Sequence, residues 1–313
     1  MEGVADMAMR ALLSELGGFT FCVAEFLRIS TSVPGVRAIQ SHVPELLQGG
    51  RTASGLPVQV QLLGGNADRL ARAALASVRA GAQAVDINFG CPARTVNRHD
   101  GGATLLQYPE RIRDIVTAVR AAVPASIPVS AKMRLGWDDI DAIHKNAERA
   151  AEGGANWITI HARTKSHGYR PPAYWKPLAA VRAQLPIPIV ANGEIWTIDD
   201  LRRCRDETGC QHFMLGRGVL ADPTLASQAA RELGIRGGGT LQSFDQTPMQ
   251  WRGLIARYAE LCTQAEMSAG YILGRIKQWL RMNNHEGMLP WFETLKGSQN
   301  LTHLMKSMDM QSA

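Results

Sequence analysis

From about residue 55 onward, short apolar runs alternate with longer stretches of helical character, and this alternation most constrains the fold. Residues 57–63 read as a strand, and Asn66 is a suitable N-cap for the Ala- and Leu-rich helix that follows to residue 80. Repeated strand–helix units of this kind imply right-handed crossovers and a parallel sheet. Further strands are expected at 84–88, 127–134, 157–161, 187–192 and 212–215, with helices at 109–123, 141–151 and 197–206.

Two architectures contain such a sheet, the closed (β/α)₈ TIM barrel and the open doubly wound sheet. An open sheet that binds dinucleotides carries G-x-G-x-x-G after its first strand, and this sequence has no such motif there. Its strands instead end in polar residues, as expected where an active site is assembled at the carboxyl ends of barrel strands. We therefore predict an α/β fold, a (β/α)₈ TIM barrel. The polar strand ends are Gln61, Asn88, Lys132, Arg134, His161, Asn192, Glu194 and Arg217.

Two regions depart from this repeat. The first residues run directly into an expected helix at 7–16, which leaves no room for a full first strand. Either the protein starts several residues upstream, which we favour, or its first barrel strand is truncated. Near residue 234 the alternation stops, a glycine-rich stretch follows, and the pattern from residue 249 onward is helical. We predict a barrel domain at 1–240 and a helical domain at 241–313.

Composition limits the function classes. The chain of 313 residues suffices for a barrel of about 250 residues with a small appendage. It has no run of about 18 apolar residues and no secretory signal, which argues against a membrane span and against export. Five scattered cysteines favour a reducing, cytoplasmic setting, and the spacing of Cys204, Cys210 and His212 fits no usual zinc site, so we expect no metal. The net charge of +6 favours a polyanionic partner such as nucleic acid.

The sharpest local signal is the loop after the strand at 84–88, where Cys91 stands between a glycine and a proline. This position puts a thiol on a constrained turn at the mouth of the barrel. Many cysteines are simply small buried residues, and position alone leaves that interpretation open.

The next strands strengthen the case for a site. Lys132 and Arg134 alternate along one strand, so both point to the same side, where two cations make poor core residues. His161 ends the following strand and is either a core histidine or part of the site. The loops at 192–194 and 216–218 are where barrels commonly hold a phosphate.

Taken in order, these motifs resemble the tRNA-dihydrouridine synthases over nearly the whole chain. The motifs are Met1-Glu-Gly-Val, Glu25-Phe, Gln59–Leu63, Asn88–Pro92, Lys132–Gly136, His161–Thr164, Asn192–Glu194 and Gly216-Arg217. Lys132–Trp137, Gly193–Trp196 and Arg275–Leu280 are especially similar to the bacterial C subfamily, which modifies uridine 16 of the D-loop.

The resemblance implies an FMN-dependent oxidoreductase in which NADPH reduces the flavin, hydride passes to C6 of uracil and a proton reaches C5. Cys91 matches the proton donor of the family, and an ordinary thiol, with a pKa of about 8.5, is protonated at neutral pH. The positive charge of Lys132 would stabilise the reduced flavin. The cofactor-binding residues implied are Met1, Gln61, Lys132, His161, Asn192, Gly193, Glu194, Gly216 and Arg217.

The resemblance also implies tRNA as the partner of a protein expected to be monomeric. Ile272, Ile276, Trp279 and Leu280 share one helical stripe suited to packing, whereas Arg275 and Lys277 become candidate phosphate contacts. The substrate-binding residues implied are Arg28, Asn88, Arg134, Tyr169, Arg275, Lys277 and Met282.

Two alternatives stay open at this point. An FMN barrel of the dihydroorotate dehydrogenase type would act on a free pyrimidine and would not need the helical domain. A tRNA-binding or folding factor without chemistry would not need Cys91.

Overall fold

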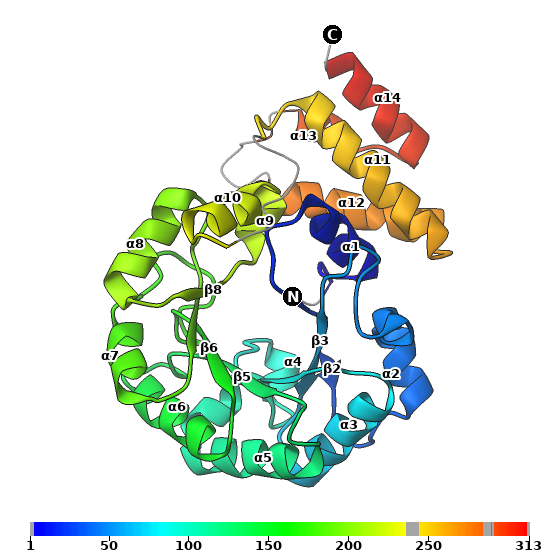
Figure 1. Cartoon of the computed structure of the whole chain (residues 1–313). Coiled ribbons are helices and arrows are strands. Elements are labelled where there is room, and N and C mark those ends of the chain that lie inside the picture. Colours follow the sequence, from blue (N-terminus) through cyan, green and yellow to red (C-terminus); the bar gives the residue numbers. More distant parts are fainter. Residues whose placement is uncertain (1–2, 236–243, 284–288, 290, 312–313) are drawn as a thin grey trace.

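The computed structural model describes residues 3–235, 244–283, 289 and 291–311. Within them eight short strands form one parallel sheet that curves into a ring, with helices on its outer side (Figure 1). The strands are β1 (Cys22–Val23), β2 (Leu27–Arg28), β3 (Val58–Leu63), β4 (Val85–Asn88), β5 (Val129–Arg134), β6 (Trp157–His161), β7 (Ile189–Asn192) and β8 (His212–Met214).

The strand order is β1-β3-β4-β5-β6-β7-β8, and β2 also pairs with β3. Cys22 lies opposite Val58 and Leu27 opposite Leu62, so β1 and β2 are two pieces of one strand position. The chain takes five steps from Cys22 to Leu27 but four from Val58 to Leu62, which is the count of a β-bulge. The sheet thus has seven strand positions, and in the described part of the chain no pairing joins β8 to β1.

The predicted α/β barrel architecture is confirmed, and the described residues fill seven of the eight strand positions of such a barrel. The six strands predicted between residues 57 and 215 all form, with bounds within two residues of those expected. The bulged strand of β1 and β2 was not predicted, because neither piece is long enough to show an alternating pattern.

The barrel helices begin and end where local sequence favours it. Asn66 caps α3 by accepting a hydrogen bond from the backbone N–H of Arg69 at 2.9 Å, and Pro109 occupies the first turn of α5, both as predicted. The helices are α1 (Met7–Leu16), α2 (Val36–His42), α3 (Ala67–Arg79), α4 (Arg94–Asn97), α5 (Pro109–Ala122), α6 (Ala142–Glu152), α7 (Pro177–Gln184), α8 (Ile198–Thr208), α9 (Arg217–Ala221) and α10 (Leu225–Glu232), with 3₁₀ turns η1 (Pro44–Gln48) and η2 (Gly102–Gln107).

Alternation along the strands separates an apolar layer from a polar interior. Val60, Ile87 and Ala131 are fully buried in the main hydrophobic cluster, which the surrounding helices complete. Their neighbours on the opposite face, including Gln61 and Asp86, are polar and equally shielded from solvent. Since successive residues of a strand point to opposite faces, the polar set faces the barrel axis. The interior is therefore built for a site rather than for packing alone.

The C-terminal part is helical, as predicted, and consists of α11 (Pro248–Gln264), α12 (Ala269–Asn283), α13 (Phe292–Leu295) and α14 (Leu301–Gln311). These helices form a second hydrophobic cluster in which the Trp251 and Trp279 rings meet edge to face, with centroids 5.2 Å apart. The cluster also takes in Met9 and Leu12 of α1, which packs beside α11 and α12 (Figure 1). The first helix of the chain thus shares a core with its last helices.

One carboxylate joins these elements. Asp6 caps α1 through Oδ1, which accepts from the Met9 N–H at 2.9 Å. Its Oδ2 accepts from the Tyr258 hydroxyl at 2.8 Å, the Tyr271 hydroxyl at 3.0 Å and Nε of Arg275 at 3.0 Å. We call these four side chains, Asp6, Tyr258, Tyr271 and Arg275, the Asp6 network.

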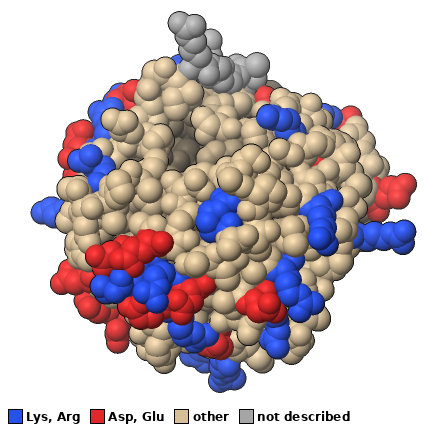
Figure 2. Space-filling view, turned by 60° about the horizontal axis from the view of Figure 1, so that its bottom comes forward, with Lys and Arg blue, Asp and Glu red and all other residues tan. Residues whose placement is uncertain are grey.

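The charged surface is mixed in sign on the face that Figure 2 shows, where Lys and Arg side chains lie beside Asp and Glu at the lower left, and a hollow opens among uncharged residues above them. Among the described residues no helix is both long and apolar enough to cross a membrane. The same residues contain no group of three or more His, Cys, Asp or Glu side chains placed to hold a metal ion.

Candidate active site

The strand register brings polar side chains together at the carboxyl ends of β3 to β7. Asp86 lies opposite Gln61 on one side and Ser130 on the other. Asn88 lies opposite Lys132, and His161 opposite both Arg134 and Asn192. Residues predicted from separate motifs are therefore neighbours across a single edge of the sheet.

Buried amides and a carboxylate form the floor of this region. Nε2 of Gln61 donates to Oδ2 of Asp86 at 2.7 Å, and the Ser130 hydroxyl donates to Oδ1 at 2.5 Å. Nδ2 of Asn88 donates to Oε1 of Gln61 at 2.9 Å. Burial raises the pKa of Asp86 to about 6, against the opposing effect of these hydrogen bonds and of Lys132. The carboxyl is therefore mostly ionised at neutral pH.

The residue before Cys91 is held at both ends of its backbone. The Gly90 N–H donates to Oδ1 of Asn88 at 2.8 Å, and the Gly90 carbonyl accepts from Nε of Arg134 at 2.8 Å. Arg134 in turn donates through Nη1 to the carbonyls of Thr164 and Gly168. Asn88 and Arg134, expected to hold the uracil, thus also fix the loop that carries the thiol.

The 3₁₀ turn η2 supports the same loop from behind. The Ala103 N–H donates to the Cys91 carbonyl at 3.0 Å. Gly102 has a φ of +60°, and a Cβ built there would lie 2.8 Å from that carbonyl oxygen. Glycine is needed at this position because any side chain would displace the Cys91 backbone.

A cationic cluster, Lys132, Arg134, Arg163 and Arg217, surrounds the floor, and all four side chains act on His161. Burial and these charges lower the pKa of His161 well below its usual value, so the imidazole is neutral. Burial, together with Arg134, lowers the pKa of Lys132 to about 8. The Lys132 ammonium donates to Oδ1 of Asn192 at 3.3 Å. The cations outnumber the nearby carboxylates, Asp86 and Glu194.

Arg163 and Glu194 define the part of the cluster best suited to an anion. Arg163 is fully buried, and its Nη2 lies 2.9 Å from Oε1 of Glu194, which also pairs with Arg217 at 3.0 Å. Its Nη1 is buried with no hydrogen-bond partner among the described residues. A buried guanidinium nitrogen without an acceptor, in a cluster of excess positive charge, fits a bound phosphate.

The loop beside this cationic cluster, which carries Gly193, is tightly built. Gly193 has a φ of +112°, and a Cβ there would lie 2.7 Å from Cδ2 of His161. The Gly193 carbonyl accepts from Nε1 of Trp175 at 2.9 Å. Backbone N–H groups can therefore approach a ligand closely at this point, as phosphate-binding loops require.

Tyr169 marks the outer edge of the site. Its side chain is 55% exposed, and the guanidinium carbons of Arg134 and Arg217 lie 5.1 and 5.3 Å from its ring centroid. An exposed aromatic ring backed by two cations is a suitable surface for stacking a nucleobase.

The remaining predicted residues lie around or away from this site. Arg28 is exposed and donates to the Thr95 carbonyl in α4, the short helix after Cys91. On α12, Arg275 belongs to the Asp6 network, Lys277 donates to the Ser298 carbonyl at 2.5 Å, and Met282 packs against the second hydrophobic cluster. Arg275 and Lys277 thus both have partners within the protein. The prediction for Met1 lies outside the described residues.

Sequence reasoning missed three contributors to the site, Asp86, Arg163 and Trp175. Asp86 stands two residues before the Asn88–Pro92 motif, and Arg163 stands inside the His161–Thr164 motif, two residues after His161. Alternation along the chain could therefore have drawn attention to both. No local signal points to Trp175, which reaches the Gly193 loop from another segment.

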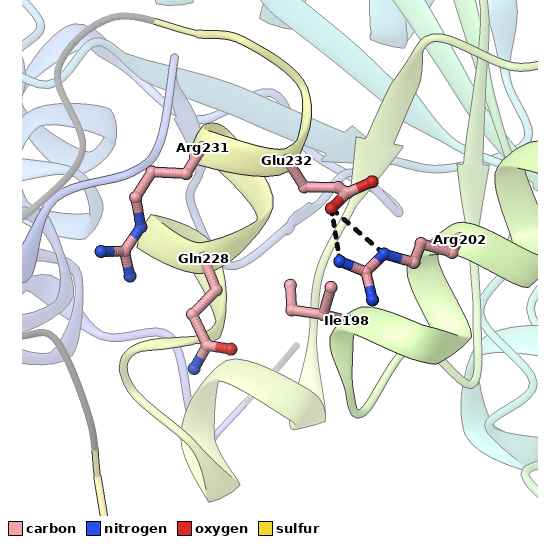
Figure 3. A pocket seen from close by; sticks show the side chains of 5 residues that line it. All are labelled: Ile198, Arg202, Gln228, Arg231 and Glu232. Atoms are coloured by element: carbon pink, nitrogen blue, oxygen red, sulfur yellow. Dashed lines mark hydrogen bonds and ion pairs between the residues drawn. The ribbon is translucent and has the colours of Figure 1, made fainter.

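A hollow of about 520 Å³ lies elsewhere, between α8 and α10 (Figure 3). In it the Arg202 guanidinium already pairs with Glu232 at 2.8 Å. The charge of Arg202 is thus already neutralised, and the hollow lies between two helices on the outer side of the ring (Figure 1). We therefore take the carboxyl ends of the strands as the candidate site. The hollow is lined by Ile198, Arg202, Gln228, Arg231 and Glu232.

Comparison with known proteins gives a consistent family. Residues 1–289 match the family model described as dihydrouridine synthase. A tRNA-dihydrouridine(16) synthase of Pseudomonas putida is 45% identical over 284 residues, which cover 90% of this chain and 85% of the relative. The protein of that description from Ralstonia nicotianae is 46% identical over 280 residues, covering 90% and 84%.

Among solved structures, histamine dehydrogenase from Rhizobium sp. 4-9 superposes with a TM-score of 0.55 at 14% sequence identity. The match covers 83% of this chain but 47% of that one, about half its length. At this identity the likeness supports the barrel fold alone.

Proposed function

The chain belongs to the dihydrouridine synthase family, and on this basis we propose that it reduces the C5–C6 double bond of uridine 16 in the D-loop of tRNA. The observation that carries the proposal is that two features lie together at the carboxyl ends of the barrel strands. These are a thiol loop held on both sides of Gly90 and a buried cationic cluster that suits a phosphate.

The cationic cluster at the strand ends supports FMN as the cofactor. We assign the phosphate to the His161, Gly193, Glu194, Gly216 and Arg217 region, next to the unsatisfied Nη1 of Arg163. Gln61, Lys132 and Asn192 would hold the flavin ring, and Met1 remains a proposed contact. When bound and reduced by NADPH, the flavin supplies the hydride that is added at C6 of uracil.

The residues of this chain then account for the rest of the reaction. Cys91 donates a proton from its thiol to C5, and the clamped Gly90 backbone keeps that thiol in place. Lys132, with a pKa of about 8, retains much of its positive charge at neutral pH and stabilises negative charge beside it. Neutral His161 adds no further charge to the cluster and offers one ring N–H and one ring nitrogen acceptor.

The substrate must be extruded from the tRNA fold to reach the thiol. We propose that Tyr169 stacks on the RNA, with Asn88 and Arg134 at the uracil and Arg28 at the rim. We also propose that Arg275, Lys277 and Met282 contact the tRNA. Arg275 and Lys277 would then bind phosphates with the N–H groups that their hydrogen bonds to Asp6 and Ser298 leave over. We further propose that the enzyme acts as a monomer in the cytoplasm.

The test is a map of dihydrouridine across total tRNA from cells with and without the gene, complemented by wild type, Cys91→Ala or Cys210→Ala. Cys210→Ala is the matched control, because Cys210 is buried near β8, outside the site. We expect loss at position 16 that wild type and Cys210→Ala restore and Cys91→Ala does not. Loss at another position would overturn the assignment of uridine 16, no loss would overturn the activity, and restoration by Cys91→Ala would exclude this thiol as the donor.

A further inference from the structure

Asp86 stands at the centre of a hydrogen-bond chain whose members all donate toward it. On one side Nε2 of Gln59 donates to the Ser130 hydroxyl at 2.8 Å, and Ser130 donates to Asp86. On the other side the Gly90 N–H donates to Asn88, Asn88 to Gln61, and Gln61 to Asp86. A carboxylate can only accept and the backbone N–H of Gly90 can only donate, so the two ends of the chain agree on the direction of every bond between them.

The direction matters because an amide has two nearly equivalent ends. In a chain of amides alone, each side chain could turn over and donate where it had accepted. Here Gln61 must point Nε2 at Asp86, which leaves Oε1 for Nδ2 of Asn88, and that leaves Oδ1 of Asn88 for Gly90. The side chain of Asp86 is 2% exposed, so water does not compete for it.

We propose that Asp86 is a positioning residue that sets this polarity, and thereby both orients the Gln61 amide toward the flavin and holds Gly90 for the Cys91 thiol. With Oε1 and one N–H engaged, Gln61 has one N–H left to offer, so it meets an acceptor atom of the ring. The assignment for Gln61 rests on the proposed function, whereas the link to Gly90 does not.

The experiment compares Asp86→Asn with Ser130→Ala. Asp86→Asn keeps the shape but provides a donor and an acceptor, so only the Gly90 N–H still dictates the direction of the Asn88 and Gln61 amides. Ser130→Ala removes the other hydrogen bond of Asp86 and leaves the Gln61 side of the chain intact. Both changes disturb the surroundings of position 86, but only Asp86→Asn changes the group that accepts from Gln61. An effect seen in Asp86→Asn alone is therefore due to the direction of the hydrogen bonds and not to packing.

Two measurements are made on each variant. The first is the rate at which iodoacetamide alkylates Cys91 in flavin-free protein, followed by peptide mass spectrometry with half-buried Cys22 as the internal reference. The second is the visible absorption spectrum and dissociation constant of added FMN. In Asp86→Asn we expect alkylation of Cys91 about threefold faster or more, since the loop opens more often. We expect a changed FMN spectrum and binding about tenfold weaker, since a hydrogen bond to a charged group is lost. Ser130→Ala should leave both near wild type.

Equal effects of the two variants would overturn the proposal, because the carboxyl would then act only through packing. No change of Cys91 alkylation or of the FMN spectrum in Asp86→Asn would overturn it as well. If Asp86→Asn does not fold, Asn88→Asp decides: it keeps the acceptor for Gly90 but cannot donate to Gln61, so the FMN spectrum should change while Cys91 alkylation stays near wild type. Wild-type protein that binds no FMN would refute the proposed function, and the alkylation rates would still test the link to Gly90.

Discussion

Asp86 couples protonation of the barrel interior to folding. Its pKa is raised from 3.8 to about 6 by burial, so the folded protein binds this proton more tightly than the unfolded chain does. The contribution of Asp86 to stability is therefore present at low pH and is lost as pH rises from about 4 to about 6. The difference between these two pKa values corresponds to about 3 kcal/mol of free energy of unfolding.

We expect the free energy of unfolding of flavin-free wild type, measured by urea denaturation at pH 4 to 7, to fall relative to that of Asp86→Asn across this window. Every other carboxyl group is common to both proteins, so the difference between the two curves isolates Asp86. Parallel curves would show that Asp86 keeps an ordinary pKa in the folded protein.

Gly102 is the second residue at which the site constrains the sequence. Gly102→Ala should destabilise the protein by about 2 kcal/mol or more, because φ is +60° and the new Cβ would press on the Cys91 carbonyl. Gly274→Ala, in α12 with open space around it, should instead stabilise by about 0.5 to 1 kcal/mol through helix propensity. Thermal unfolding of the two variants measures both values, and changes of the same sign would contradict the geometry at Gly102.

At this scale the sequence predicted residues that stand at strand ends inside local motifs. Gln61, Lys132, His161 and Asn192 lie together because register in a parallel sheet is enough to make strand ends neighbours. The convergence of donors on Asp86 could not be read from the sequence, since it depends on which side chains share an inner face. The partners of Arg275 could not be found either, because Asp6 and Glu25 lie at the other end of the chain.

Among the elements, α1 is tied to the C-terminal helices by two ion pairs of different kind. Asp6 pairs with Arg275, and both side chains are largely buried. Glu15 pairs with Arg257 of α11, and both are about one-third exposed. The two pairs connect the same parts of the molecule, so they form a matched comparison of buried and surface electrostatics.

Asp6→Asn should lower the free energy of unfolding by about 3 kcal/mol, because it leaves Arg275 buried without its main partner while asparagine still caps α1. Glu15→Gln should lower it by less than about 1 kcal/mol, as is usual for an exposed pair. Urea denaturation of both variants checks the contrast. Equal losses would mean that the Asp6 network adds nothing beyond a surface contact.

How well elements could be predicted depended on their length. Strands such as β3 and β5, with six residues each, show the alternation that sequence reasoning needs. The pieces β1 and β2 have two residues each, too few to show alternation, and they form strands because they pair with β3.

For the whole molecule, shared packing predicts cooperative unfolding. The second hydrophobic cluster contains α1 and Leu220 of α9 as well as the C-terminal helices, and Nε1 of Trp279 donates to the Leu220 carbonyl at 3.0 Å. Barrel and helical region should therefore unfold in one transition.

Urea titrations followed by tryptophan fluorescence and by far-ultraviolet circular dichroism should coincide in wild type. Trp251, Trp279 and Trp291 lie in the helical cluster and the other four tryptophans in the barrel, so the fluorescence follows both parts, as the circular dichroism of the helices does. Asp6→Asn should separate the two curves. Separate transitions already in wild type would show that the two clusters are independent.

The place of α1 in the second cluster also sets an order in time. On the ribosome α1 is made early, and the helices that bury Met9 and Leu12 follow more than 230 residues later. At a synthesis rate of 5 to 20 residues per second, α1 waits roughly 10 to 50 s for its partners. During that interval its apolar face is open to chaperones, until the much later helices complete its environment.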